Sequence, residues 1–238
     1  MTVIKEVHAS VKGSYGSPRM TVELHSRGYS CGHNRVARIM RKNGIIAKRT
    51  IRFRRLTRAG KRQSAAPNYL DRQFAVSSAN RVWASDITYI PTAEGFLYLA
   101  VVIDLFSRKV VGWGMSSRLN PELVVNALSQ ALLRRGIPAN LMHHSDQDVL
   151  YSGAAYQRLL AENGISCSMS RKGNCYDNAC VESFFGSLKN ELVHFIKYDS
   201  RDQAALELFG WIEVFYNRVR RHSTLGYMSP IDYEQNKC

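Results

Sequence analysis

Three consecutive segments between residues 82 and 117 are rich in Val, Ile, Tyr, Phe and Trp and are separated by short polar turns. They are VWASDITYI (82–90), FLYLAVVIDLFS (96–107) and KVVGWGMSS (109–117). Because β-branched and aromatic residues favour extended backbone, and short connections favour antiparallel neighbours, we expect a three-stranded meander. Any fold of this chain has to be built around that sheet.

After the meander, helix-like and strand-like patterns alternate. Residues 120–135 predict a helix, with Pro121 at its first position, apolar residues at helical spacing, and Gly136 as a stop. The next expected elements are a strand, a helix, a strand and a long helix: LMHHSD (141–146), 153–163, ISCSMS (165–170) and the segment from Asn178. This order predicts an α/β fold, a mixed five-stranded sheet with helices on both faces, as in a ribonuclease-H-like core.

Residues 2–48 show the pattern of three short helices broken at turns that contain glycine. The expected helices cover residues 2–11, 17–27 and 32–43. In the third, the apolar positions Val36, Ile39 and Met40 would share the buried side. The positions left toward solvent or DNA are Arg35, Arg38, Arg41 and Lys42. We therefore expect a small all-α helix-turn-helix module, with a helical bundle that has a basic face as the alternative.

The formal net charge of +14 lies entirely in the amino-terminal part of the chain. Residues 1–65 hold 16 Lys and Arg against two acidic residues, and the remainder has no net charge. The run RTIRFRRLTRAGKR (49–62), which includes Arg52, Arg54 and Arg55, would repel itself without a polyanionic partner. Nucleic acid is the expected partner, because the apolar residues of this run form no amphipathic stripe suited to a membrane surface.

These patterns divide the chain into four expected parts. They are a helix-turn-helix-like module (1–48), a basic linker (49–80), a ribonuclease-H-like core (81–200) and a C-terminal helical extension (201–238). The longest apolar run is too short to span a bilayer, and the amino terminus lacks a signal-peptide pattern. We therefore expect a cytoplasmic, DNA-associated protein with no membrane partner.

The five cysteines are irregularly spaced and form no C-x-x-C pair, which predicts reduced thiols. A zinc site made by His25, Cys31 and His33 is an alternative, but these residues lack the paired spacing of zinc fingers.

Three carboxylates lie on rigid elements with apolar surroundings. Asp86 is inside a strand, Asp146 ends a short strand, and Glu182 lies one turn into a helix. Carboxylates packed together repel one another, and a bound divalent cation is the usual compensation. Their hard oxygen ligands favour Mg²⁺, with Mn²⁺ as a substitute. Two such ions can activate a water or a 3′-hydroxyl and stabilise the leaving oxygen of a phosphoryl transfer.

Acidic spacing by itself is a weak signal in this chain. Asp146 and Glu182 are separated by 35 residues, but so are Asp86 and Glu122, and so are Asp177 and Glu213. The contexts distinguish the pairs, because Glu122 lies in the first turn of a helix and Glu213 on an ordinary amphipathic helix.

Four ordered blocks of the sequence resemble one family. They are DRQFAVSSANRVWASDITYI (71–90), HHSDQDVLYSG (143–153), SRKGNCYDNACVESFFGSLKNEL (170–192) and FYNRVRRHSTLGYMSPIDYE (215–234). The segment YGSPRMTVELHSRGYSCGHNRVARIMRKNGI (15–45) resembles the DNA-binding region that precedes the catalytic core in the same family. The family is that of integrase-like DDE transposases, and the chain resembles the catalytic, second-frame subunit of a two-frame bacterial insertion sequence.

The resemblance implies that Asp86, Asp146 and Glu182 are the DDE triad, which cuts one strand at each element end and transfers its 3′-hydroxyl. It implies that Lys189, two helical turns beyond Glu182, approaches the terminal DNA. Asp177 and Asn178 resemble a family pair that we interpret as capping the catalytic helix and fixing the approach of Glu182, rather than as metal ligands. The implied partners are terminal repeats, target DNA, a product or fusion from an upstream frame, and further copies of the chain on DNA.

One block departs from the family pattern. Asp148 and Leu150 stand where the family usually has Gly and Gln. A glycine permits a positive-φ turn that Asp tolerates less well, so we expect strain and an added negative charge beside the metal site. This departure motivates one alternative, a non-catalytic DNA-binding remnant or regulator of transposition. A second alternative is a nuclease of the same fold that acts on RNA in hybrids, which the basic amino-terminal module and the four matching blocks disfavour.

Overall fold

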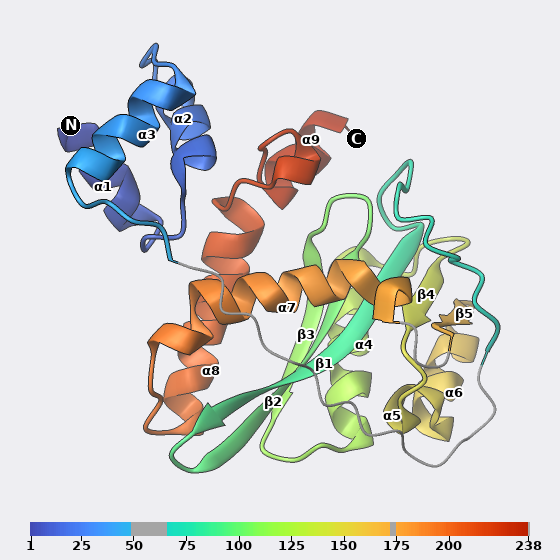
Figure 1. The fold of residues 1–238 in the computed structure, drawn as a ribbon. Coiled ribbons are helices and arrows are strands. Elements are labelled where there is room, and N and C mark those ends of the chain that lie inside the picture. Colours follow the sequence, from blue (N-terminus) through green and yellow to red (C-terminus); the bar gives the residue numbers. More distant parts are fainter. Residues whose placement is uncertain (49–65, 172–174, 238) are drawn as a thin grey trace.

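The computed structural model describes residues 1–48, 66–171 and 175–237. Its centre is a five-stranded sheet in the order β3-β2-β1-β4-β5 (Figure 1). The first three strands form the expected antiparallel meander, and the last two add in parallel beside β1. The strands are β1 (Val82–Thr92), β2 (Gly95–Asp104), β3 (Val110–Ser116), β4 (Met142–Ser145) and β5 (Ser166–Met169).

The two central strands separate part of the way along the sheet. β1 pairs with β2 from Trp83 to Thr92, whereas its pairing with β4 ends at Ala84, opposite His144. Asp86 follows two residues after this point on β1, and Asp146 follows two residues after it on the other strand. The divergence of two parallel strands at their carboxyl ends is where open α/β sheets commonly place a site.

Helices cover both faces of the sheet, and Figure 1 shows α7 crossing one face with α4 on the other. Successive strand residues point to opposite faces, so Val101 packs with α7 and Val102 packs with α4. The helices of one face are α4 (Pro121–Arg135), α5 (Val149–Ser152) and α6 (Ala154–Glu162). Those of the other are α7 (Ala179–Glu191) and α8 (Arg201–Phe209).

Strand β3 and helix α4 approach unusually closely. A Cβ atom on Gly112 would lie 2.2 Å from the main-chain oxygen of Ala127, and one on Gly114 would lie 2.7 Å from that of Leu123. Only glycine permits this approach, so the GWG sequence of β3 sets the distance between the sheet and α4.

The C-terminal part of the chain is helical. α8 continues through a π-helical segment (Gly210–Tyr216), and a 3-10 helix (Ser223–Leu225) and α9 (Pro230–Lys237) follow. The carboxylate of Glu234 on α9 accepts hydrogen bonds from Ser107 (2.7 Å), Lys109 (3.0 Å) and Arg135. These bonds attach α9 to the turn between β2 and β3 and to the end of α4.

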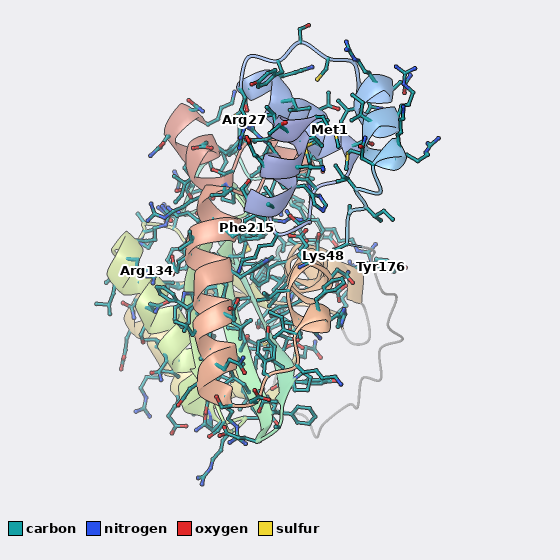
Figure 2. The ribbon with its side chains drawn as sticks, turned by 90° about the vertical axis from the view of Figure 1, so that its left-hand side faces the viewer. Met1, Arg27, Lys48, Arg134, Tyr176 and Phe215 are labelled. Atoms are coloured by element: carbon teal, nitrogen blue, oxygen red, sulfur yellow. The ribbon has the colours of Figure 1, made fainter. Side chains whose placement is uncertain are left out.

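The amino-terminal helices are α1 (Thr2–Ser10), α2 (Ser17–Ser26) and α3 (His33–Lys42). They enclose a separate apolar core, and Phe215 of the π-helical segment packs against it. Figure 2 shows Phe215 on the long C-terminal helix directly beneath these helices. On α3, Val36 and Met40 are buried and Ile39 is half-buried, as the sequence predicts. We call residues 1–48 the N-terminal module. Across the described ranges, no helix has both the length and the apolar character needed to cross a membrane.

Candidate active site

The three candidate carboxylates lie on three elements around the point where β1 and β4 diverge. Asp86 is on β1, Asp146 follows β4, and Glu182 is in the first turn of α7; all three are half-buried. Two are also bonded to local backbone, since Oδ1 of Asp86 accepts from the amide of Ile87 (2.8 Å) and Oδ1 of Asp146 accepts from that of Asp148 (3.0 Å).

The charges of the two aspartates both act on one buried side chain, Tyr151 of α5. Burial raises the pKa of the Tyr151 hydroxyl well above its usual value, and Tyr156 and the charges of Asp86, Asp146 and Asp148 raise it further. Charges act on a titrating group only from nearby. Asp86 and Asp146 therefore share one electrostatic environment, although 59 residues lie between them in the sequence.

Helix α7 is attached to β1 beside Asp86. The side-chain nitrogen of Asn178 donates a hydrogen bond of 3.0 Å to the main-chain oxygen of Ser85, and Val181 packs in the same apolar cluster as Ala84. Glu182 follows one turn along this helix. Within residues 1–48, 66–171 and 175–237, no three His, Cys, Asp or Glu side chains form a group that could hold a metal ion. The fold thus brings the three elements together without gathering the three carboxylates into one metal-holding group.

The predicted capping role is wrong for Asp177, which is completely buried. Asn178 occupies the N-cap position of α7, but its side chain makes no capping hydrogen bond. The Asp177 carboxylate accepts hydrogen bonds from the Arg171 backbone and guanidinium (each 3.0 Å), from Arg72 (2.9 Å) and from Asn68 (3.0 Å). Hydrogen bonds from Arg171, ahead of those from Arg72, hold the pKa of Asp177 well below its usual range. Asp177 joins the segment before β1 to the start of α7.

The other acidic pairs with the same spacing have structural explanations. Glu122 is exposed in the first turn of α4. Glu213 lies in the π-helical segment rather than in an ordinary helix, and it accepts from Trp113 Nε1 (2.7 Å) and Arg134 (2.5 Å). Asp177 is bound by two arginines. We therefore exclude both other acidic pairs with this spacing, Asp86 with Glu122 and Asp177 with Glu213, as cation sites.

The expected strain after Asp146 is absent. Asp148 has φ −65°, an ordinary extended conformation, and it caps the four-residue helix α5 by accepting from the Leu150 amide at 2.9 Å. Leu150 is buried in the α4 face of the core. Because a helix begins here, the position needs an N-cap residue rather than a positive φ, and Asp is a favoured N-cap.

Lys189 lies beside an aromatic surface that sequence reasoning missed. Its Nζ is 5.2 Å from the ring centroid of Tyr89 on β1, and the Tyr89 ring is 4.9 Å from that of Phe96 on β2. Tyr89 is 55% exposed and Phe96 is 48% exposed. The strand register places Tyr89 and Phe96 on one face of the hairpin. The sequence shows the alternation within each strand, but it does not show which residues of the two strands pair.

The other sequence-predicted DNA-binding residues divide into two sets. Arg35, Arg38, Arg41 and Lys42 are all exposed on α3, as predicted. Arg52, Arg54 and Arg55 lie outside the described residues.

Comparisons with known proteins agree with this architecture. Residues 76–175 match a family described as integrase core domain, residues 163–230 match a second integrase core domain family, and residues 1–53 match an HTH-like domain. The transposase InsF for insertion sequence IS3A of Escherichia coli (strain K12) is 44% identical over 98% of this chain and 81% of its own length. The transposase for insertion sequence element IS904 of Lactococcus lactis is 43% identical over 98% of this chain and 92% of its own length.

Two solved structures share the fold at low sequence identity. An intasome of simian T-cell lymphotropic virus in complex with PP2A regulatory subunit B56 gamma has a chain with a TM-score of 0.55 and 16% identity, covering 97% of this chain and 74% of that chain. The HTLV-2 integrase catalytic core domain in complex with magnesium gives a TM-score of 0.51 and 18% identity, covering 66% of this chain and 97% of that chain.

The integrase core domain match and these relatives define an integrase-core polynucleotidyl transferase of the DDE class. The chain belongs to the family of transposases of bacterial insertion sequences represented by those of IS3 and IS904.

Proposed function

We propose that this protein binds the ends of its insertion sequence and catalyses metal-dependent strand cleavage and 3′-hydroxyl strand transfer through Asp86, Asp146 and Glu182. The placement of Asp86 and Asp146, each two residues beyond the last paired residues of β1 and β4, is the observation that carries the proposal. The Asn178 bond to Ser85 supports the inclusion of Glu182, because it attaches α7 to the strand that bears Asp86.

The chemistry of the three carboxylate donors suits a hard divalent cation. All three candidate ligands are half-buried carboxylates with oxygen donors, which suit Mg²⁺, or Mn²⁺ in its place, and we propose two ions at the site. When bound, such ions supply Lewis-acid activation of the attacking and leaving oxygens. The carboxylates would hold these ions, and Lys189 with Tyr89 offers a cation and a ring face to the DNA end.

The N-terminal module provides the contact with duplex DNA. The exposed basic positions of α3 are spaced so that one side of the helix meets phosphates and the groove, while Val36 and Met40 anchor its other side. We propose that Arg52, Arg54 and Arg55 extend this contact along the backbone. The same proposal includes the four-part division of the sequence and a partner from the upstream frame. It also includes a homo-oligomer on DNA, because joining two element ends requires two active sites to meet.

A direct test uses the purified full chain and a duplex that carries the terminal repeat of its own element. We expect transfer of the 3′ end in Mg²⁺ or Mn²⁺, and we expect Asp86→Asn, Asp146→Asn and Glu182→Gln each to abolish transfer while retaining DNA binding. Glu122→Gln is the matched control, because it removes an exposed carboxylate with the same spacing from Asp86. It should transfer at the wild-type rate.

Two results would contradict the proposal. A wild-type chain without strand chemistry, alone or fused to its upstream-frame product, would support a DNA-binding remnant, especially if Asp148→Gly restored transfer. Preferred cleavage of the RNA strand in a hybrid would instead support a nuclease of the same fold.

A further inference from the structure

Residues 216–221 contact three parts of the molecule that are far apart in sequence. The Asn217 side chain makes two hydrogen bonds with the main chain of Val110 on β3. Its Oδ1 accepts from the Val110 amide and its Nδ2 donates to the Val110 oxygen, both at 3.0 Å. The Tyr216 hydroxyl donates to the main-chain oxygen of Arg108 at 3.0 Å. These bonds fix the segment to the edge of the sheet.

Arg220 connects this segment to the end of α7. Its buried guanidinium donates to both carboxylate oxygens of Glu191 (2.8 Å from Nε and 2.6 Å from Nη2) and to Ser187 Oγ (3.1 Å). Burial lowers the pKa of Arg220, but the bonds and charge of Glu191 outweigh this effect and raise it. A bidentate buried pair of this kind constrains orientation, because removing either partner leaves a buried charge without compensation.

Arg221, the next residue, connects the same segment to the N-terminal module. Its Nε donates to Glu23 at 2.7 Å and its Nη2 donates to Ser26 at 2.8 Å. The Tyr15 hydroxyl accepts from the Arg221 amide (2.8 Å) and donates to the oxygen of Val219 (3.2 Å). The chain is not helical at these two arginines, and consecutive side chains point to opposite sides, one toward α7 and one toward the module.

Glu191 also meets the module directly. Arg19 of α2 lies 3.4 Å from its carboxylate, and the Lys48 ammonium donates to its main-chain oxygen at 2.6 Å. Figure 2 shows Lys48 between the module and α7. A cleft of about 370 Å³ lies between these parts, with Ser183 and Gly186 of α7 in its lining.

We propose that Arg220, Arg221, Tyr15 and Glu191 are positioning residues that hold the N-terminal module in one orientation relative to α7. This inference rests on the proposed function, because DNA held by α3 would then reach the candidate catalytic centre in one register. The fourth sequence block thereby acquires a role in selecting the nucleotide at which the strand is cut. The residues act through α7 and the module and do not touch the reacting atoms.

Two substitutions loosen the module without touching the Arg220 pair with Glu191. Arg221→Gln removes the bond to Glu23, and Tyr15→Phe removes the hydroxyl shared with residues 219 and 221. The matched control is Arg27→Gln, because Arg27 is the other arginine that binds Glu23 (2.9 Å) but lies within the module itself. All three proteins are tested as full chains.

The first readout is independent of catalysis. Probes placed by unnatural amino-acid incorporation at two exposed positions, Asn43 at the end of α3 and Leu133 on α4, measure the distance between module and core. We expect a narrow distribution in the wild type and in Arg27→Gln. We expect a clearly broader one in Tyr15→Phe combined with Arg221→Gln, with about a tenfold larger population of displaced modules once these hydrogen bonds are removed.

The second readout is the position of the cut on the terminal-repeat duplex. The wild type and Arg27→Gln should cut at one nucleotide, and the double variant should cut at several, with unchanged affinity for DNA and an unchanged fold by circular dichroism. An unchanged distance distribution would overturn the inference, and so would a broadened distribution with cutting at a single nucleotide. If the wild type cuts no DNA, the proposed function fails, and the distance measurement still decides whether these residues fix the module.

Discussion

The side-chain amide of Asn178 lies 3.0 Å from the main-chain oxygen of Ser85, and this hydrogen bond joins the start of α7 to the residue before Asp86. Because Glu182 follows one turn later, the bond sets the approach of α7 to β1. We expect Asn178→Ala to lower the rate of strand transfer about 10- to 100-fold, the usual effect of removing a group that orients metal ligands. Single-turnover transfer assays measure this rate.

The matched control is Asn163→Ala, at the end of α6, where the side-chain amide donates a hydrogen bond to the local main-chain oxygen of Leu159. Both variants should bind terminal-repeat DNA with wild-type affinity. Equal transfer rates for Asn178→Ala and the control would exclude a positioning role for Asn178.

The basic face of α3 predicts a specific salt dependence. Replacing Arg35, Arg38 and Arg41 together by Gln should reduce the slope of log affinity against log salt by about 0.9 for each phosphate that α3 no longer neutralises. Arg134→Gln is a control, since Arg134 is already bonded to Glu213 in the core. Binding isotherms at several salt concentrations measure the slope, and an unchanged slope would show that α3 does not bind phosphates. The same measurement applies to Arg52, Arg54 and Arg55.

Gly112 predicts a large and local effect on stability. Gly112→Ala places a Cβ 2.2 Å from the Ala127 oxygen, so β3 and α4 must move apart. Overpacking of this kind lowers the free energy of unfolding by about 1–3 kcal/mol. Gly186→Ala on α7 meets nothing within 4 Å and should raise it by about 0.5–1 kcal/mol through helix propensity. Urea titrations measure both, and equal stabilities would contradict the close approach.

Buried histidines predict a loss of stability in mild acid. Burial lowers the pKa of His143 to about 3 and, with the charges of Arg220, Arg19 and Arg108, lowers that of His222 to about 2. The unfolded chain takes up these protons near pH 6.5, whereas the folded chain does so only in strong acid. The free energy of unfolding is therefore highest above pH 6.5, where both histidines are neutral in the folded and the unfolded chain. It decreases as the pH falls toward the lowered pKa values of the folded chain.

When the pH is lowered from 7 to 5, each such histidine should lower the free energy of unfolding by about 2 kcal/mol. His222→Asn should reduce the loss by about this amount, whereas the exposed-site control His33→Gln should leave it unchanged. Urea titrations at the two pH values provide the comparison. An identical loss in the wild type and His222→Asn would show that His222 is not kept neutral by the fold.

The strands, the long helices and the three helices of the N-terminal module are predictable because their apolar residues repeat with clear periods. The buried side of α3 follows from the spacing of Val36 and Met40, and the meander follows from three adjacent β-rich segments. Such local patterns contain the information for element type. The local contexts also predict the element on which each of the three candidate carboxylates lies, and the structure has Asp86 on β1, Asp146 after β4 and Glu182 in the first turn of α7.

Two predictions failed, one because a side chain distant in sequence contributes and the other because the helix concerned is very short. Asp177 resembles an N-cap in sequence, but Arg72, more than a hundred residues earlier in the chain, binds its carboxylate. Asp148 resembles a strained turn residue, but it begins α5, a four-residue helix too short to show periodicity. The Arg220 pair with Glu191 had no sequence signal, since nothing local links a tail arginine to the end of a helix.

The contact of Gly112 and Gly114 with α4 gives the two faces of the sheet different mechanical properties. Backbone pressed against backbone leaves no side chain that can rotate to absorb a displacement, so the α4 face resists shear. The α7 face is joined to the sheet by apolar side chains and by the Asn178 side-chain bond to Ser85, and side chains can rotate. We therefore expect a displacement of α7 relative to the sheet to require less free energy than a displacement of α4.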